Sequence, residues 1–411
     1  MTEDLIDFSL QENESSIIKV IGVGGGGGNA VNYMYKQGIK DVDFIICNTD
    51  AQALETSEVP VKIQLGESLT EGRGAGNKPE RGEQSAIENL EDINEVLADN
   101  TKMVFITAGM GGGTGTGAAP VIAKAAKDMG ILTVGIVTIP FRFEGRQRLH
   151  QAIAGINKLK ENVDSLLVIN NEKLSEIYGD LKLSTAFSKA DDVLATAAKG
   201  IAEIITLHGY INVDFEDVKT VMTDSGVAVM GSASAEGENR AVNAIRGALT
   251  SPLLNSNDVR GARNILLNIS SGEDEVTMDE VGQITDYVQE AVGDYASIIW
   301  GTGQDFSLEN KVSVTIIATG FDNGLIPEEN ISPKPESFKA GRGRSSVAEQ
   351  VKMHLEEEED KLEDNKLILT DLKDTEIDEI ENIPAYKRKL NNLGDHNFQS
   401  GKIIRFKLDD E

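Results

Sequence analysis

A run of seven glycines and threonines, Gly111 to Gly117, constrains this chain more than any other stretch of its 411 residues. The run follows the apolar stretch 103–107, which predicts a buried strand, and precedes 120–129, which predicts a helix with a proline at an early position. In such a strand, loop and helix, the unpaired backbone N–H groups and the positive dipole end of the helix face the loop. Phosphate is the ligand that this loop favours, with hydroxyl donors from Thr114 and Thr116.

A second glycine-rich loop of the same kind lies near the start of the chain. The stretch 17–21 predicts a strand, the segment 22–29 contains six glycines, and 30–37 predicts a helix. The Gly-x-Gly-x-x-Gly spacing also matches a dinucleotide-binding fingerprint, and Asp50 lies where a ribose-binding acid is expected. A nicotinamide-dependent Rossmann oxidoreductase is therefore one alternative. An ordinary P-loop NTPase is disfavoured because no Walker lysine follows either loop.

The composition is that of a folded protein with a strongly acidic balance. With 40% hydrophobic residues, the chain is long enough for two domains and a tail. Its formal net charge of −29 argues against a nucleic-acid partner, because no basic face opposes the repulsion of a polyanion. Cys47 is the single cysteine, which indicates a reducing compartment. Neither a signal peptide nor a transmembrane segment is expected, because the N-terminus is polar and acidic and no long apolar run follows.

Short apolar runs alternate with helical stretches through the first half of the chain. This alternation predicts an α/β fold with a doubly wound parallel sheet. The expected strands lie near residues 17–23, 42–47, 103–108, 131–138 and 165–170. A long helix over 188–208, with apolar residues on several faces, is expected to lie buried between two layers and to join two domains.

The second half predicts a smaller α+β domain followed by a disordered acidic tail. Strands are expected near 226–230, 264–269 and 312–318, with helices near 239–249 and 277–292. Prolines and acidic residues change the character of the chain beyond residue 320. The expected segments are a disordered N-terminus 1–15, a nucleotide-binding domain 16–187, the central helix 188–208, a C-terminal domain 209–320, an acidic linker 321–381, an apolar and basic peptide 382–390, and an extension 391–411 without an assigned role.

Taken together, the two loops resemble the tubulin and FtsZ superfamily of GTPases, whose signature is the run at 111–117. Other segments are similar to the bacterial FtsZ family in order and spacing. They are GVGGGGGNAV at 22–31, NTDAQAL at 48–54, GAGN at 74–77, PFRFEG at 140–145 and NVDFED at 212–217. The resemblance covers roughly residues 15 to 320. It implies a GTPase that polymerises head-to-tail into the filaments of the bacterial cell-division ring, the Z ring.

The resemblance also implies which residues bind the phosphates of GTP and GDP. Two groups of residues would hold them, namely Gly25, Gly26, Gly27, Gly28 and Asn29 from the first loop, and Gly113, Thr114 and Gly115 from the second. A segment near the γ-phosphate would distinguish GTP from GDP, namely Gly74, Ala75, Gly76 and Asn77. Mg²⁺ would bridge the phosphates and be held mainly by phosphate oxygens and water, so the sequence names no protein ligand for it.

Further side chains would bind the nucleoside. By the resemblance, Glu144 would accept hydrogen bonds from the ribose hydroxyls and Arg148 would pair with phosphate or base. An exposed ion pair between the two, one helical turn apart, is the structural alternative. Phe187 would stack on the base. Asp191 would accept hydrogen bonds from the N1 and N2 donors of guanine, with Asp192 as a competitor for that role.

The catalytic groups are expected after the long helix. Hydrolysis of the γ-phosphate needs a positioned water, and the glycine loops carry neither acid nor base. By the resemblance, a loop of one subunit covers the nucleotide of the next, where Asp214 and Asp217 polarise the attacking water and Asn212 helps to seat it. Such a composite site would make hydrolysis depend on filament formation, since head-to-tail association that does not close yields a filament. A helix N-cap with favourable carboxylates is the structural alternative.

The same resemblance implies partners and a location. Besides further copies of itself, the chain would bind membrane-anchoring division proteins of the FtsA type through Ile383 to Leu390, and division-site inhibitors. It would work in the cytoplasm, at the division site on the inner face of the membrane. A tubulin-like plasmid-segregation GTPase is a second alternative. A non-catalytic scaffold is disfavoured because both Asp214 and Asp217 are present.

Overall fold

The structure of the chain is a computed structural model that divides into two compact units, residues 1–331 and 332–411. Only the first unit contains residues that the structure describes. They are 15–39, 41–178, 182–206, 211, 213–250, 259–293 and 296–321. The predicted linker from residue 322 on, the peptide from Ile383 to Leu390 and the extension 391–411 therefore lie outside the described residues, as does Asn212.

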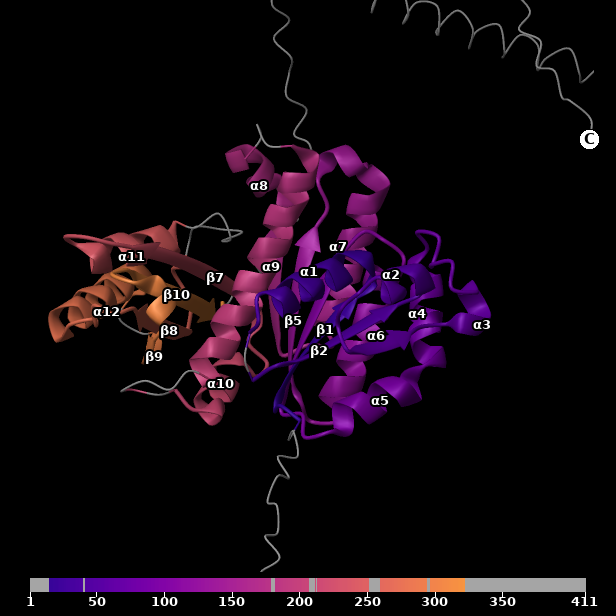
Figure 1. The fold of residues 1–411 in the computed structure, drawn as a ribbon, viewed down its shortest axis with the longest axis horizontal. Coiled ribbons are helices and arrows are strands. Elements are labelled where there is room, and N and C mark those ends of the chain that lie inside the picture. The colour runs from indigo at the N-terminus through magenta and orange to yellow at the C-terminus, as the bar shows by residue number, and fades with distance from the viewer. Residues whose placement is uncertain are drawn as a thin grey trace, which may run out of the picture. The chain divides into compact units, whose positions relative to one another are not determined.

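Parallel strands with helices on both faces form the first half of the chain (Figure 1). The strands are β1 (Ile18–Val23), β2 (Asp43–Asn48), β3 (Val61–Gln64), β4 (Met103–Gly109), β5 (Leu132–Ile139) and β6 (Ser165–Asn170). Their order in the sheet is β3-β2-β1-β4-β5-β6, which confirms the predicted α/β class. The chain changes direction across the sheet between β1 and β4, so the loops that follow these two strands meet at its carboxyl edge.

Two hydrophobic cores lie on opposite faces of this sheet. The helices of this half are α1 (Gly24–Lys36), α2 (Ala51–Glu55), α3 (Glu67–Thr70), α4 (Pro79–Glu88), α5 (Leu90–Ala98), α6 (Thr114–Asp128), α7 (Arg146–Lys160) and α8 (Asn171–Tyr178), with a short 3₁₀ turn at Arg142–Glu144. Strand β1 serves both cores: Ile18 and Val20 pack on the side of α1, whereas Ile21 and Val23 pack on the side of α4 to α7. The alternation along a strand thus covers both faces.

Both glycine loops are more helical than the sequence suggested. Helix α1 begins at Gly24 rather than near residue 30, and α6 begins at Thr114 rather than at 120, so the proline lies inside α6. The glycines are required by close packing. A Cβ atom on Gly27 would stand 2.2 Å from the carbonyl oxygen of Thr107, and one on Gly115 would stand 2.7 Å from that of Gly109. The first turns of both helices thus lie directly against the backbone of β4.

The long helix α9 (Leu183–Thr206) lies between the two halves of the chain (Figure 1). It begins at Leu183 rather than at 188, so Phe187 lies within the helix. It packs on α1 and β5 of the first half and on β7 (Gly226–Ala235) of the second. The remaining elements are α10 (Phe215–Met222), α11 (Arg240–Leu249), α12 (Met278–Val292), β8 (Asn264–Ser271), β9 (Ser297–Gln304), β10 (Val312–Thr319) and a 3₁₀ turn at Phe306–Leu308.

The expected second sheet continues the first instead of standing apart. Strand β7 pairs with β6 in parallel at its start and with β10 in the antiparallel sense further along. The ten strands therefore follow one order that ends β6-β7-β10-β8-β9. The sequence patterns missed β3 and β9, because both are short or partly exposed strands without a clear apolar run.

No helix in the described part of the chain is long and apolar enough to cross a membrane.

Two neighbouring glycines of α1 test the packing argument. We expect Gly27→Ala to lower the free energy of unfolding by at least about 2 kcal/mol, because its new methyl group meets the Thr107 carbonyl. Gly28→Ala is the matched control. No described atom lies within 4 Å of its ideal Cβ, so the better helix former should leave stability unchanged or raise it by up to about 1 kcal/mol. Urea unfolding of the nucleotide-free protein measures both values, and equal values would contradict the close approach.

Candidate functional site

A pocket of about 370 Å³ opens at the carboxyl ends of β1 and β4. It brings together ten of the residues that the sequence assigned to nucleotide binding, although they are spread over more than 160 positions of the chain. They are Gly25, Gly26, Asn29, Gly113, Thr114, Gly115, Glu144, Arg148, Phe187 and Asp191. Helices α1 and α6 form one end of the pocket, and α9 lies at the other.

The N-termini of α1 and α6 both open into this pocket. The residues before them, Val23 and Gly113, provide no side-chain cap among the described residues. Side-chain caps are present elsewhere, on α2 from the Asp50 carboxylate and on α12 from the Thr277 hydroxyl, whereas α4, α5, α7 and α11 also begin without one. Two uncapped first turns leave several backbone N–H groups and two positive dipole ends directed at one space, which suits a polyphosphate.

The other predicted phosphate ligands lie beside the pocket and do not line it. Gly27 is buried against the backbone of β4, and Gly28 lies further along the α1 surface. The segment from Gly74 to Gly76 approaches the second loop from outside. An ideal Cβ atom on Gly113 would stand 2.8 Å from the Cβ atom of buried Ala75. This segment therefore supports the loop from behind in this structure.

The two threonines of the second loop differ in their surroundings. The Thr114 hydroxyl lies at the pocket and shares a 2.7 Å hydrogen bond with the Thr49 hydroxyl. The Thr116 hydroxyl, which the sequence suggested as a ligand donor, is buried and accepts a 2.8 Å hydrogen bond from the backbone N–H of Gly111. Thr116 therefore fixes the shape of the loop, in which Gly111 has a φ of 98°.

One face of α9 forms the far wall of the pocket. It presents Phe187, Ala190, Asp191 and Leu194, which follow the spacing of a helical stripe. Burial raises the pKa of the Asp191 carboxyl to about 6. The neighbouring Asp192 points to another side of the helix. Its Oδ1 accepts a 2.9 Å hydrogen bond from the Tyr33 hydroxyl, so Asp191 is the carboxylate that the structure places at the pocket.

Three aromatic rings meet at the edge of this wall. Phe187 contacts the buried ring of Phe141 edge-to-face, with ring centroids 5.3 Å apart, and Phe141 stacks on Phe143 at 5.0 Å. Phe187 remains 40% exposed. A supported ring with one free face can stack on a planar base.

Glu144 and Arg148 form the ion pair that the sequence left open as a structural alternative. Arg148 Nη1 donates to Glu144 Oε2 at 2.7 Å. Glu144 Oε1 also accepts a 2.9 Å hydrogen bond from the backbone N–H of Phe141. Both residues line the pocket, and the Arg148 side chain is 47% exposed, so a ligand can still reach it.

Asn171 is a pocket residue that the sequence patterns missed. It is the first residue of α8, directly after β6, and it is 5% exposed. Its Oδ1 is buried and accepts no hydrogen bond from the described residues. A buried carbonyl without a partner is costly unless a ligand donates to it. Its position at the carboxyl end of a predicted parallel strand could have indicated it.

Asp214 and Asp217 lie away from this pocket, at the start of α10. Asp217 N donates to Asp214 Oδ1 at 2.8 Å, and Asp214 N donates to Asp217 Oδ2 at 3.3 Å. The helix-cap geometry that was the structural alternative is therefore present. Both residues are nevertheless solvent-accessible, so the cap does not prevent a second role.

Asp50 does not serve the pocket as a dinucleotide fold would require. Its Oδ1 accepts hydrogen bonds from the backbone N–H groups of Gln52 and Ala53 at 3.0 and 3.3 Å. It is a helix cap and is absent from the pocket lining. The oxidoreductase alternative thus loses its ribose-binding acid.

The described residues contain no group of three or more His, Cys, Asp or Glu side chains placed to hold a metal ion.

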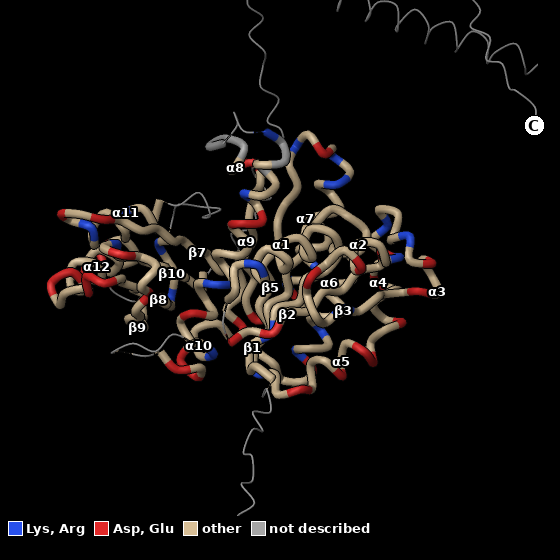
Figure 2. Tube along the Cα trace, in the orientation of Figure 1, with Lys and Arg blue, Asp and Glu red and all other residues tan. Residues whose placement is uncertain are grey.

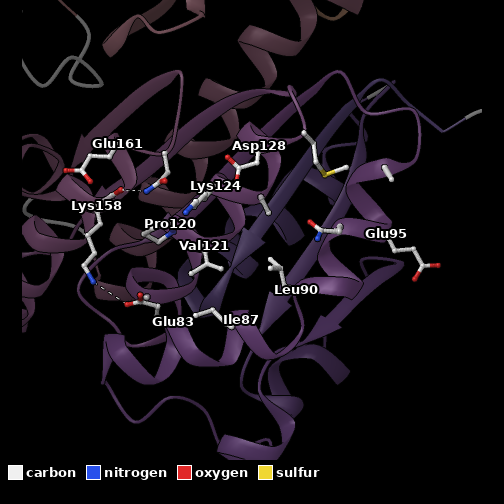
Figure 3. A pocket seen from close by; sticks show the side chains of 16 residues that line it. Glu83, Ile87, Leu90, Glu95, Pro120, Val121, Lys124, Asp128, Lys158 and Glu161 are labelled. Atoms are coloured by element: carbon white, nitrogen blue, oxygen red, sulfur yellow. Dashed lines mark hydrogen bonds and ion pairs between the residues drawn. The ribbon is translucent and has the colours of Figure 1, made fainter.

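A larger groove of about 930 Å³ lies behind the phosphate loops, between α4, α5, α6 and α7 (Figure 3). Its floor includes Ile87, Leu90 and Val121. Its rim carries four carboxylates and two lysines, Glu83, Glu95, Asp128, Glu161, Lys124 and Lys158. Lys158 pairs with Glu83 at 3.3 Å. An apolar groove with an acidic rim does not suit a polyphosphate, so the smaller pocket is the candidate site.

Two family models match the chain. Residues 17–179 match the GTPase domain of the tubulin/FtsZ family, and residues 226–322 match the C-terminal domain of the FtsZ family.

Curated proteins and solved structures agree with these matches. The chain is 51% identical over 325 residues to the cell division protein FtsZ of Porphyromonas gingivalis, covering 78% of this chain and 71% of that protein. It is 51% identical over 316 residues to the cell division protein FtsZ of Pseudomonas aeruginosa, covering 76% and 80%. An empty FtsZ dimer from M. jannaschii superimposes with a TM-score of 0.71 at 43% identity, over 75% of this chain and 89% of that one.

The raised pKa of Asp191 predicts a pH-dependent stability. The pKa of this carboxyl is about 6 in the folded protein and 3.8 at its ordinary value. As the pH rises from 3.8 to 6, the unfolded chain therefore loses its proton first, and the folded state becomes less stable. Asp191→Asn should therefore stabilise the ligand-free protein at pH 7.5 by up to about 3 kcal/mol, with a smaller gain at pH 5. Urea unfolding at both pH values measures this, and a variant less stable than wild type at pH 7.5 would contradict it. Asp192→Asn should show no such gain, because it gives the Tyr33 hydroxyl a neutral acceptor in place of a charged one and removes the ion pair with Lys189.

Proposed function

This chain belongs to the FtsZ family, and from that premise we propose that it is a GTPase that polymerises head-to-tail into filaments for cell division. The observation that carries the proposal is the meeting of two uncapped glycine-rich helix N-termini in one pocket, opposite a half-buried carboxylate on α9. The first feature suits the phosphates of a nucleotide. The second suits a base that carries hydrogen-bond donors.

The phosphates would lie over the first turns of α1 and α6, held by the backbone N–H groups of Gly25, Gly26, Gly113, Thr114 and Gly115. Asn29 would add a side-chain donor. The segment Gly74 to Asn77 would respond to the γ-phosphate indirectly. It packs against Gly113, so a shift of the second glycine loop on binding GTP or GDP would move it. Mg²⁺ would complete the site by neutralising the phosphate oxygens, and the scarcity of acidic side chains in the pocket fits a metal held chiefly by phosphate and water.

Guanine would be recognised between α9 and α8. Phe187 would stack on the ring, while Asp191 would accept hydrogen bonds from N1 and N2. Asn171 Oδ1 offers a further acceptor that no described residue occupies. Glu144 and Arg148 would exchange part of their mutual ion pair for contacts to ribose and phosphate, which the partly exposed Arg148 side chain can reach.

The catalytic carboxylates would act on the nucleotide of a neighbouring subunit. Asp214 and Asp217 do not line the pocket of their own chain, and their mutual hydrogen bonds hold both at the exposed start of α10. Acidic residues mark α10 and α12, whereas α7 begins with Arg146 and Arg148 beside the pocket (Figure 2). Opposite charges at the two ends favour head-to-tail contact. Asn212 would help to seat the attacking water.

The partners follow from the same family assignment. We propose that Ile383 to Leu390 binds membrane anchors of the FtsA type, that division-site inhibitors act on the filament, and that the protein works in the cytoplasm at the division site. The oxidoreductase alternative is disfavoured because Asp50 caps α2, and the matches to cell-division proteins disfavour the plasmid-segregation alternative.

Hydrolysis that depends on concentration tests the composite site. GTP turnover per molecule should appear only above a threshold protein concentration and rise with light scattering, because the carboxylates come from a second subunit. Asp217→Asn should lose at least about a hundredfold in turnover while retaining GTP binding. Glu216→Gln is the matched control, since Glu216 lies in the same helical turn, exposed, and pairs loosely with Lys219 at 4.0 Å.

A mixing experiment separates a composite site from a complete one. Adding Asp217→Asn subunits to a variant with a defective pocket should restore part of the turnover. The first variant supplies an intact pocket, and the second supplies an intact Asp217 carboxylate. Turnover that is independent of concentration, or that mixing cannot restore, would place the whole site in one chain.

The unpartnered carbonyl of Asn171 predicts a loss of binding without a loss of folding. Asn171→Leu should weaken GDP binding about 5- to 100-fold, which corresponds to one buried hydrogen bond. The free energy of unfolding should change little, since no described residue uses this carbonyl. Asn170→Ala is the contrasting control. It removes a 3.0 Å hydrogen bond to the backbone N–H of Glu172 and should lower stability more than affinity. Titration calorimetry and urea unfolding measure the two effects.

A further inference from the structure

Helix α1 supports the candidate site at two successive turns. Its first turns bring Gly25, Gly26 and Asn29 to the pocket. Tyr33 lies four residues after Asn29, on the same side of the helix and directly below the pocket lining. The ring of Tyr33 packs half-buried against the core that α1 shares with α9. Because Tyr33 contacts α9, a shift of the first glycine loop at the start of α1 can move α9 as well.

The partner of Tyr33 on α9 is Asp192, the residue next to the carboxylate at the pocket. Tyr33 Oη donates to Asp192 Oδ1 at 2.9 Å, and Lys189 Nζ lies 3.3 Å from Asp192 Oδ2. Both carboxylate oxygens are thus engaged, one from each helix. The hydrogen bond to Asp192 and burial raise the pKa of the Tyr33 phenol above its ordinary value, so the hydroxyl remains a donor in neutral and mildly alkaline solution.

We propose that Tyr33 is a positioning residue for base recognition, which acts through Asp192 to hold Asp191 at a fixed distance from the phosphate loop on α1. The inference rests on the proposed function, because it takes the pocket between these helices as the nucleotide site. Adjacent residues on a helix point about 100° apart, so one carboxylate can be tied to α1 while the next faces the ligand. The hydrogen bond between Tyr33 and Asp192 thus fixes the rotation of α9 about its axis at the turn that carries Asp191.

The contact gives each of the two adjacent aspartates a different role. Asp191 lines the pocket, and burial raises the pKa of its carboxyl, which suits an acceptor kept for a ligand. Asp192 makes the contact between the helices. Without the Tyr33 hydrogen bond, the start of α9 would be held to α1 mainly by apolar packing, which is not directional. Hydrogen bonds to charged groups add the direction that discrimination between bases requires.

Discrimination between GDP and IDP tests the proposal, since inosine lacks the exocyclic amino group of guanine. Tyr33→Phe keeps the ring and removes the hydroxyl. We expect its affinity for GDP to fall about 5- to 10-fold and its affinity for IDP to fall much less, so that the GDP-to-IDP ratio drops. Tyr35→Phe is the matched control, because Tyr35 lies on the same helix, is 40% exposed and packs on Phe44. It should keep the wild-type ratio.

A double-mutant cycle with Asp192→Asn completes the test. If Tyr33 acts through Asp192, the double variant should discriminate no worse than either single variant. A purely structural role would lower the affinities for both nucleotides equally and leave the ratio at its wild-type value, which would overturn the proposal. Additive losses in the double variant would overturn it as well. Failure of the wild-type protein to bind GDP would instead refute the proposed function, so the two failures are distinguishable.

Discussion

The contact of helix backbone with strand backbone at the glycines is the constraint on which the rest of this structure depends. At Gly27 and Gly115 no Cβ atom fits, because carbonyl oxygens of β4 lie 2.2 and 2.7 Å from where it would stand. This approach lets two helices begin directly over the carboxyl ends of adjacent strands. Their free N–H groups are consequently aligned by the packing of the sheet itself. The site that we propose for the phosphates is therefore formed by the packing of the core itself.

The other walls of the pocket are built around the first turns of α1 and α6. Helix α9 contributes Phe187 and Asp191, the turn before α7 contributes Glu144, and α7 itself contributes Arg148. These side chains contact one another: Glu144 pairs with Arg148, and Phe187 packs edge-to-face on Phe141. Asp191 and Asn171 are different, because burial opposes the charge of one and leaves the carbonyl of the other without a partner among the described residues. Ligand binding would relieve both penalties, which directs affinity towards a base with hydrogen-bond donors.

The resemblance to the FtsZ family, and not a local pattern, predicted the pocket residues Glu144, Arg148, Phe187 and Asp191. From its own patterns the sequence could predict the parallel sheet and the two glycine loops, because a glycine run between an apolar strand and a helix is typical of a phosphate-binding loop. It could not predict where the helices begin. At Gly24 and Thr114 the helical state is decided by contacts with β4, against the low helix propensity of glycine. It also could not separate Asp191 from Asp192, since their roles depend on the rotation of α9 and on Tyr33, which is distant in sequence. Asn171 was missed because its position after a predicted strand marks the edge of the sheet where ligands bind but does not single out this residue.

The strand β7 has a mechanical consequence. It pairs with β6 over three residue pairs but with β10 over seven. Each residue pair adds backbone hydrogen bonds that must break when the strands separate. The pairing of β7 with β6 is therefore weaker than the pairing of β7 with β10. A pull applied between the two halves would be borne there and along α9, which contacts both. In a chain of subunits linked end to end, tension between the halves would load this short pairing together with the apolar core that both halves share.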